Sequence, residues 1–309
     1  MNTGLLLTII IGTTTLIMVV GGGAAVVYEA VKGTLPAPNR FEDIRNMFLI
    51  PGINEFIPVL WGIIALLIAV VVHEVGHAVM CAAQDIKIKS TGIVMFLIPI
   101  AAFVEPDEDV LFEKKNRDGT PAVINRIERL RVFASGVSAN FIVAALSFFT
   151  FFILFRTLVP VHGYQGVFDI VSSIPHGILG FRLLSLARLI FIPLLGIIPN
   201  IGPNTGLSLS NMISITYFRP TVIQNFVFPL LSLSLWTGWI NLMVGMFNSL
   251  PALPLDGGYV FRDVVGTFMG FFMKDCTKVE RKAAVLTGIF TIGIFTSIII
   301  SACVQLILR

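Results

Sequence analysis

Five stretches of the chain are predominantly apolar over more than twenty positions, with hydrophobic residues on every side of a helix rather than along one face. A helix that rises about 1.5 Å per residue needs roughly twenty such residues to cross the hydrocarbon core of a bilayer. The pattern therefore predicts five membrane-spanning helices, at about 5–28, 57–83, 132–156, 224–249 and 284–308.

Two further apolar stretches are less regular. Residues 178–198 carry Arg182 and Arg188, so this stretch is expected to be a sixth span, a re-entrant hairpin or an interfacial helix. Residues 92–104 are too few to span, and Pro99 disfavours a regular helix, which predicts a β-type segment that dips into the membrane and lines a cavity. The predicted fold is an all-α polytopic membrane protein with about six transmembrane helices and a short re-entrant β segment.

The composition agrees with a membrane protein, because 56% hydrophobic and 13% charged residues leave too little polar surface for water-soluble globules of this size. The net charge of +3 is spread over loops and forms no basic patch, which argues against a nucleic-acid partner and leaves the lipid bilayer as the first expected partner. The cysteines, Cys81, Cys276 and Cys303, show no paired spacing and are interpreted as apolar filler. The first span has no preceding Lys or Arg and is longer than a signal-peptide core, so it is expected to be retained.

Basic residues gather in two connecting segments, 84–131 and 259–282, which predicts that both lie on the cytoplasmic side of the cell membrane. The N-terminus is then expected inside and the C-terminus outside, provided that 178–198 does not cross by itself. The basic residues concerned are Lys87, Lys89, Lys114, Lys115, Arg117, Arg126, Arg129 and Arg131 in the first segment, and Arg262, Lys274, Lys278, Arg281 and Lys282 in the second.

His73, Glu74 and His77 form the sequence HEVGH within the second predicted span. Histidines four residues apart leave the same face of a helix and can bind one metal ion, with Glu74 beside them to polarise a water molecule. A lone histidine is more often a satisfied core residue, but three polar groups together in an apolar run are unfavourable without a function. The motif therefore predicts the site of a zinc hydrolase.

Tetrahedral zinc in a hydrolase needs a third protein ligand, and Asp256 is the candidate. It follows the 224–249 span in a segment where two prolines break the helix, and where Gly257 and Gly258 are expected to let the backbone turn the carboxylate inward. The alternative is an ordinary loop aspartate at the membrane surface. The charge pattern puts Asp256 and His77 toward the same cytoplasmic side, so the two can meet at one depth.

HEVGH in a span, followed far downstream by NSLPALPLDGG from Asn248 onward, resembles the site-two protease family of intramembrane metalloproteases. The resemblance implies zinc held by His73, His77 and Asp256, with Glu74 as the general base and Asn248 acting on the substrate or the oxyanion. It also implies cleavage of transmembrane or membrane-tethered proteins, such as a membrane-anchored regulator, near the cytoplasmic leaflet.

The sequence SGVSAN at 135–140 resembles, more weakly, a Gly-Pro-x-x-Asn element of the same family, with Val137 in place of the proline. Asn140 is expected either to supply a catalytic polar contact near the metal or to make a helix–helix hydrogen bond. Many relatives insert a PDZ domain, but the 157–222 region is short and apolar, so none is expected here. His162 and His176 fall in this outer region and are interpreted as surface residues.

The chain is predicted to consist of a first span and outer loop (1–56), a metalloprotease core (57–258), and a cytoplasmic loop with the last span (259–309). Two other classes of protein could contain a metal-binding motif of this kind. A membrane zincin of the prenyl-protein protease type would take a glutamate as third ligand from a further helical motif, which the sequence lacks. A catalytically inactive metal-binding scaffold or transporter would have no need of Glu74.

Overall fold

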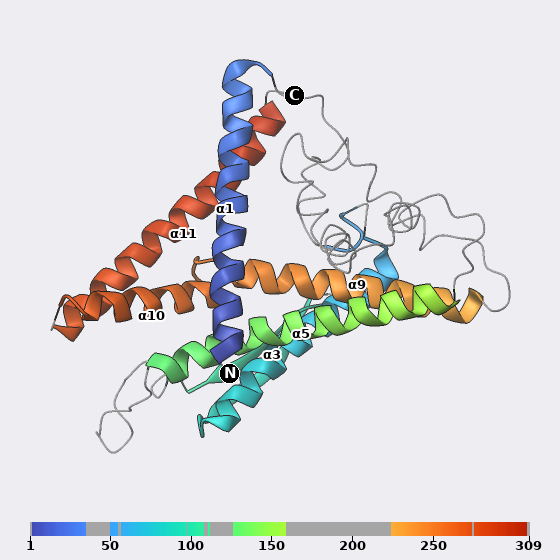
Figure 1. Cartoon of the computed structure of the whole chain (residues 1–309), viewed down its shortest axis with the longest axis horizontal. Coiled ribbons are helices and arrows are strands. Elements are labelled where there is room, and N and C mark those ends of the chain that lie inside the picture. The colour runs from blue at the N-terminus through green and yellow to red at the C-terminus, as the bar shows by residue number, and fades with distance from the viewer. Residues whose placement is uncertain are drawn as a thin grey trace, which may run out of the picture. The chain divides into compact units, whose positions relative to one another are not determined.

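The computed structural model describes residues 2–34, 50–54, 57–96, 98–107, 111, 126–158, 224–273 and 275–307. The stretch at 178–198, His162, His176 and the question of a PDZ domain all lie outside these residues. Six helices and one hairpin account for the long elements of the described chain (Figure 1). They are α1 (Asn2–Lys32), α3 (Val59–Ala83), β1 (Ile88–Phe96), β2 (Ile98–Pro106), α5 (Arg126–Leu158), α9 (Gln224–Asn248), α10 (Asp256–Gly270) and α11 (Cys276–Ile307).

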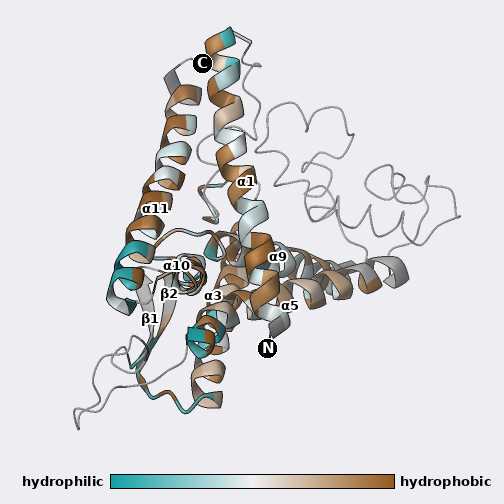
Figure 2. Cartoon of the chain, turned by 60° about the vertical axis from the view of Figure 1, so that its left-hand side comes forward, coloured by the Kyte–Doolittle hydropathy of each residue, from teal (hydrophilic) through white to brown (hydrophobic). Residues whose placement is uncertain are grey.

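Five of the helices, α1, α3, α5, α9 and α11, are long and apolar enough to cross a membrane, and they coincide with the five predicted spans. Figure 2 shows hydrophobic residues along the length of α1 and α11 and hydrophilic ones at the start of α11. Both α5 and α11 begin before the predicted apolar stretch, because polar first turns extend each helix beyond it. The prediction of an all-α polytopic protein is confirmed for the described chain.

The predicted β-type segment at 92–104 lies within an antiparallel hairpin formed by β1 and β2. In the register of the hairpin Thr91 pairs with Val104, and Gly92 with Phe103. A Cβ atom at Gly92 would stand 2.7 Å from the Phe103 ring, so the lack of a side chain at Gly92 leaves room for that ring across the hairpin. This pairing fixes where β2 presents Phe103 and Val104.

Contacts between residues divide the chain into two compact units, and every predicted site residue belongs to the first. That unit comprises Met1–Val20, Ala65–Ala145 and Ile240–Ile299. It therefore contains the HEVGH turns of α3, the hairpin, the first part of α5, the end of α9, all of α10 and most of α11. The site can be described within this unit alone.

Two glycines bring α3 and α5 unusually close together. A Cβ atom at Gly76 would lie 2.7 Å from the Ser135 carbonyl oxygen and 3.1 Å from the Gly136 Cα. A Cβ atom at Gly136 would lie 2.5 Å from the Nε2 atom of His77. Real Cβ atoms do not pack at such distances, so only glycine lets the backbone of α5 approach the histidine face of α3.

The sequence predicts a cytoplasmic loop at 259–282, and this prediction is wrong for 259–270, which form most of helix α10. Asp256 opens this helix, where its negative charge is favoured by the N-terminal end of the helix dipole. The expected role of Gly257 and Gly258 in turning the backbone is also wrong, because both are helical. Added Cβ atoms there would come within 2.2 Å of the Ser249 carbonyl oxygen and 2.6 Å of the Ala252 carbonyl carbon. The glycines therefore pack α10 against the turn that follows α9.

Buried charge fastens α10 to α5. The Arg129 guanidinium donates two hydrogen bonds to the Asp263 carboxylate, from Nε at 2.7 Å and from Nη2 at 2.6 Å, and both side chains are only 3% exposed. Such a bidentate pair fixes direction as well as distance. It lies seven residues after Asp256, so it sets the position of the helix whose first residue is the predicted third ligand.

Helix α11 begins with a side-chain cap at Asp275. The carboxylate accepts hydrogen bonds from the Thr277 hydroxyl at 2.6 Å and from the backbone N–H groups of Thr277 and Lys278 at 3.1 and 3.3 Å. These donors, the Thr277 hydroxyl first among them, lower the pKa of the Asp275 carboxyl. The cap defines where the last span starts.

Candidate metal centre

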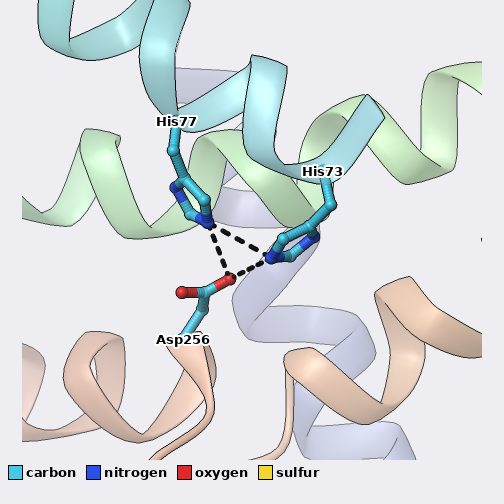
Figure 3. A group of neighbouring side chains, drawn as sticks. All are labelled: His73, His77 and Asp256. Carbon is cyan, nitrogen blue, oxygen red and sulfur yellow. Dashed lines mark hydrogen bonds and ion pairs between the residues drawn. The ribbon is translucent and has the colours of Figure 1, made fainter. Parts of the chain in front are cut away.

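His73 and His77 stand one turn apart on α3 and point the same way (Figure 3). Their Nε2 atoms are 3.2 Å apart, and the ring planes are nearly perpendicular, at 84°. Both residues are buried. The helical spacing of HEVGH thus brings two ring nitrogens to one point, as the sequence predicted.

The carboxylate of Asp256 meets the two imidazoles from α10, as Figure 3 shows. Its Oδ2 atom lies 2.9 Å from Nε2 of His73 and 3.2 Å from Nε2 of His77. Helix α9 ends at Asn248, and the turn at 249–255 then delivers Asp256 to this position. HEVGH and the segment that follows α9 are distant in the sequence, and together they bring three possible ligand atoms close to one another.

The Nδ1 atoms of both histidines face oxygen acceptors. His73 Nδ1 lies 2.6 Å from Oδ1 of Asn140, and His77 Nδ1 lies 2.8 Å from the Val132 carbonyl oxygen. Because the Asn140 amide nitrogen is turned to another carbonyl, its oxygen must be the atom facing His73. Each neutral ring then carries its proton on Nδ1 and keeps a lone pair on Nε2.

Two imidazole nitrogens and one carboxylate oxygen therefore converge, which is an arrangement of donor atoms that a cation can bind. Oδ2 of Asp256 is buried and accepts no hydrogen bond from the described residues. The separations of 2.9 to 3.2 Å are close to the value of about 3.3 Å expected between ligands of a tetrahedral zinc ion. His73, His77 and Asp256 are a group able to hold a metal ion, and they fit zinc.

Asn140 lies behind His73 rather than beside the open side of the site. Its side chain is fully buried, and its amide nitrogen donates to the Ala69 carbonyl oxygen at 2.9 Å and to Oδ1 of Asn241 at 3.0 Å. With its oxygen facing His73, every polar group of this side chain is engaged. Of the two roles expected for Asn140, these contacts favour the helix–helix hydrogen bond.

Asn241 is a site residue that sequence reasoning missed. It is fully buried in α9 and accepts from Asn140, which in turn accepts from His73. A signal was present, because an asparagine in the middle of an apolar span is unfavourable unless it bonds to a neighbouring helix. No spacing rule connects Asn241 to HEVGH, however, so only the fold reveals the chain of bonds.

Glu74 lies next to the ligand group and is held by the hairpin. Its Oε2 atom accepts a hydrogen bond of 2.7 Å from the backbone N–H of Val104. That N–H is therefore not used in pairing with β1, and β2 presents it toward the site. The hairpin thus positions the carboxylate that HEVGH places beside the two histidines.

A cavity of about 380 Å³ opens onto the group of three ligands. Its polar lining consists of His73, Glu74, His77, Asn248 and Asp256, and the rest of the lining is apolar. Asn248 is half-buried, and within the described residues its side chain makes no hydrogen bond, in contrast to Asn140. Its amide is available to a molecule that enters the cavity.

The family model described as Peptidase family M50 matches residues 61–299, most of the chain. The chain belongs to peptidase family M50. The match confirms the resemblance to the site-two proteases, a family of intramembrane metalloproteases, and it includes both motifs that carry the three converging ligand atoms. Together with its five apolar helices, membership in this family makes the chain an integral membrane protein.

A similar protein is found in Methanocaldococcus jannaschii, where it is described as uncharacterized. The two are 27% identical over 249 residues, which cover 75% of this chain and 62% of the relative. The chain thus spans less than two thirds of the length of that relative. No solved structure matches this member of family M50.

Proposed function

We propose that the protein is a zinc-dependent endopeptidase of family M50 that cleaves transmembrane or membrane-tethered proteins, with a membrane-anchored regulator as one such substrate. The observation that carries the proposal is the convergence of three lone-pair atoms from His73, His77 and Asp256 beside Glu74, in one cavity. A core with only a structural purpose would not be expected to bring two imidazole nitrogens and a carboxylate oxygen to one buried point.

The residues divide into ligands, a base and a substrate contact. His73, His77 and Asp256 would hold the zinc ion, which when bound supplies Lewis-acid activation of water and of the scissile carbonyl. Glu74, which lines the same cavity, would take a proton from the attacking water and give it to the leaving amine. Asn248, with its amide unengaged, would donate to the oxyanion or hold the substrate backbone.

A transmembrane substrate must unwind locally, because a helix hides its carbonyl groups in backbone hydrogen bonds. The hairpin offers a place for the unwound segment, since Phe103 and Val104 of β2 line the cavity. An extended peptide can add to such a strand through main-chain hydrogen bonds, with little dependence on its side chains. The apolar lining of the cavity suits residues that come from a membrane span.

The site is proposed to face the cytoplasmic side of the cell membrane. Basic residues between α10 and the first turns of α11, and before and within the first turns of α5, support this orientation, because positively charged loops remain inside. Substrate cleavage would then occur near the cytoplasmic leaflet. The division into a first span, a metalloprotease core at 57–258 and a C-terminal part remains a proposal.

The second candidate is a catalytically inactive metal-binding scaffold or transporter. It would use the same three ligands but would have no need of Glu74. The hydrogen bond from Val104 holds Glu74 in the cavity with the ligands, which favours the peptidase.

The test is zinc quantitation on the purified protein, followed by cleavage of a single-span model substrate. Glu74→Ala should keep the zinc content and lose cleavage by about a hundredfold or more, since general acid–base catalysis supplies roughly that factor. Asp256→Ala should lose both zinc and cleavage. Glu105→Gln, an exposed glutamate of β2, is the matched control and should change neither. Undiminished cleavage by Glu74→Ala would sink the mechanism.

A further inference from the structure

The second half of α10 and the two residues that follow it carry apolar side chains that are exposed. Val264, Phe268, Phe271 and Phe272 are spaced i, i+4, i+7 and i+8, so they share one side of the helical path. Their exposed fractions are 37%, 64%, 80% and 76%, whereas Asp263 on another side is buried. The Phe268 and Phe272 rings contact each other edge to face, with centroids 5.3 Å apart. An aromatic cluster this exposed needs an apolar partner.

Positive charge lies directly beside this face, on the first two turns of α11. Lys278, Arg281 and Lys282 are exposed there, in the part of α11 that Figure 2 shows as hydrophilic next to α10. Lys278 is paired with Asp275, and Glu280 is occupied by arginines of α5 and α10. Within the described residues no ion pair is recorded for Arg281 or Lys282, so these two turns have positive charge in excess of negative.

The same turns mark the edge of the hydrocarbon core. Past Lys282 the outward residues of α11 become apolar, with Val285, Ile289 and Ile292 exposed at 57%, 60% and 69%. The three basic residues therefore stand where a span leaves the hydrocarbon and enters the headgroup layer. Figure 1 shows that the end of α10 meets the start of α11, and Phe271 and Phe272 lie in the short connection between the two helices.

We infer that the end of α10 and the start of α11 form a membrane-interface anchor that binds anionic phospholipids. The phenylalanines would enter the boundary between headgroups and acyl chains, while Arg281, Lys282 and Lys278 bind lipid phosphates. Aromatic and basic residues on adjacent faces are the combination that holds a helix in this layer. A leaflet of neutral lipid would accept the phenylalanine rings but would not neutralise the basic side chains. The excess of positive charge therefore favours anionic lipid.

The anchor lies at one end of α10, and Asp256 lies at the other. Because α10 is a continuous helix of fifteen residues, a shift at one end moves the other end as well. The Arg129–Asp263 pair holds the middle of this helix. Anionic lipid is therefore expected to stabilise the position of Asp256 and to raise cleavage. This last step rests on the proposed function, whereas lipid binding does not.

The depth of the anchor can be measured with Phe271→Trp in the full-length protein, reconstituted in phosphatidylcholine–phosphatidylglycerol bilayers. The emission of the added tryptophan is the difference between the spectra of the variant and the parent protein, and it should be blue-shifted. It should be quenched most by lipids that carry bromine on the part of the acyl chain nearest the headgroup. Water-like emission without quenching by any brominated lipid would overturn the anchor.

The choice of lipid can be measured by the thermal unfolding shift in phosphatidylglycerol relative to phosphatidylcholine. Arg281→Gln/Lys282→Gln should lose most of this shift and about thirtyfold in lipid affinity, since each basic residue near an anionic surface contributes roughly fivefold. Lys32→Gln/Lys87→Gln removes the same charge from exposed positions elsewhere and should keep the shift. Equal shifts in both lipids, or an equal loss in the two double variants, would contradict selection of anionic lipid.

Cleavage separates the anchor from the proposed function. If lipid binding behaves as expected but no bilayer supports cleavage of a model substrate, the peptidase proposal fails and the anchor stands. If cleavage is strong but does not depend on phosphatidylglycerol or on Arg281 and Lys282, the inferred effect of lipid on Asp256 is wrong.

Discussion

Asn140 faces His73 across a hydrogen bond of 2.6 Å, on the side of the imidazole opposite the Asp256 carboxylate. The bond fixes which ring nitrogen carries the proton, and so leaves Nε2 free to bind a metal. Asn241 and the Ala69 carbonyl hold Asn140 in turn. One ligand is therefore oriented by residues of α5 and α9, neither of which touches the ligand atom.

Replacement of Asn140 by Ala should weaken zinc binding by about ten- to a hundredfold, because loss of an outer partner to a ligating histidine typically has that effect. Competition with a chromophoric chelator measures the affinity directly, without reference to activity. Ser138→Ala is the matched control, since among the described residues the Ser138 hydroxyl bonds to the Ala134 carbonyl of its own helix and not to either histidine. Unchanged zinc affinity in Asn140→Ala would remove this residue from the support of the site.

Much of the fold and the central site followed from sequence, for identifiable reasons. The spans were predictable because a bilayer demands long apolar stretches, and His73 with His77 because a helix brings residues four apart onto one face. The meeting of these histidines with Asp256 required an additional argument from charge and membrane depth. Each of these predictions uses a rule that applies to one segment alone, or to two segments that lie in the same membrane.

What escaped prediction depends on packing between segments. Helix α10 was missed because two glycines after two prolines favour a turn, whereas the glycines fit between backbones only once α10 lies against the end of α9. Asn241 was missed because its meaning depends on Asn140 of another helix. The partner of Glu74 was equally hidden, since a backbone N–H from Val104 leaves no trace in the sequence.

Gly136→Ala should disrupt the site although it adds only one methyl group. The new Cβ would stand 2.5 Å from Nε2 of His77 and 2.9 Å from Cε1 of His73, so the two rings or the backbone of α5 must shift. Zinc affinity is expected to fall about tenfold or more, as for other changes that misplace a ligand. Gly288→Ala is the control, because a Cβ at Gly288 meets nothing within 4 Å. Equal zinc affinities for the two variants would show that a methyl group at position 136 does not disturb the two histidines.

Asp263→Ala should destabilise the protein by about 3 to 5 kcal/mol, because it leaves the Arg129 guanidinium buried without its carboxylate. The double change Arg129→Met/Asp263→Leu should lose much less, since no charge then remains buried. Thermal or denaturant unfolding in mild detergent measures both. If the double variant is no more stable than Asp263→Ala, the cost lies in lost packing rather than in an unpaired charge.

Val104→Pro removes the N–H that holds Glu74 in the cavity. Proline is tolerated on a strand edge whose N–H is not used in the sheet, and Val104 donates to Glu74 instead of to β1. Zinc content should therefore be retained while cleavage falls by about tenfold or more, as expected when a donor that orients a catalytic carboxylate is lost. Val104→Ala keeps the N–H and should cleave at nearly the parental rate. A loss of zinc in Val104→Pro would instead mean that the hairpin supports the ligands themselves. Equal cleavage by the proline and alanine variants would mean that neither Glu74 nor the substrate depends on this donor.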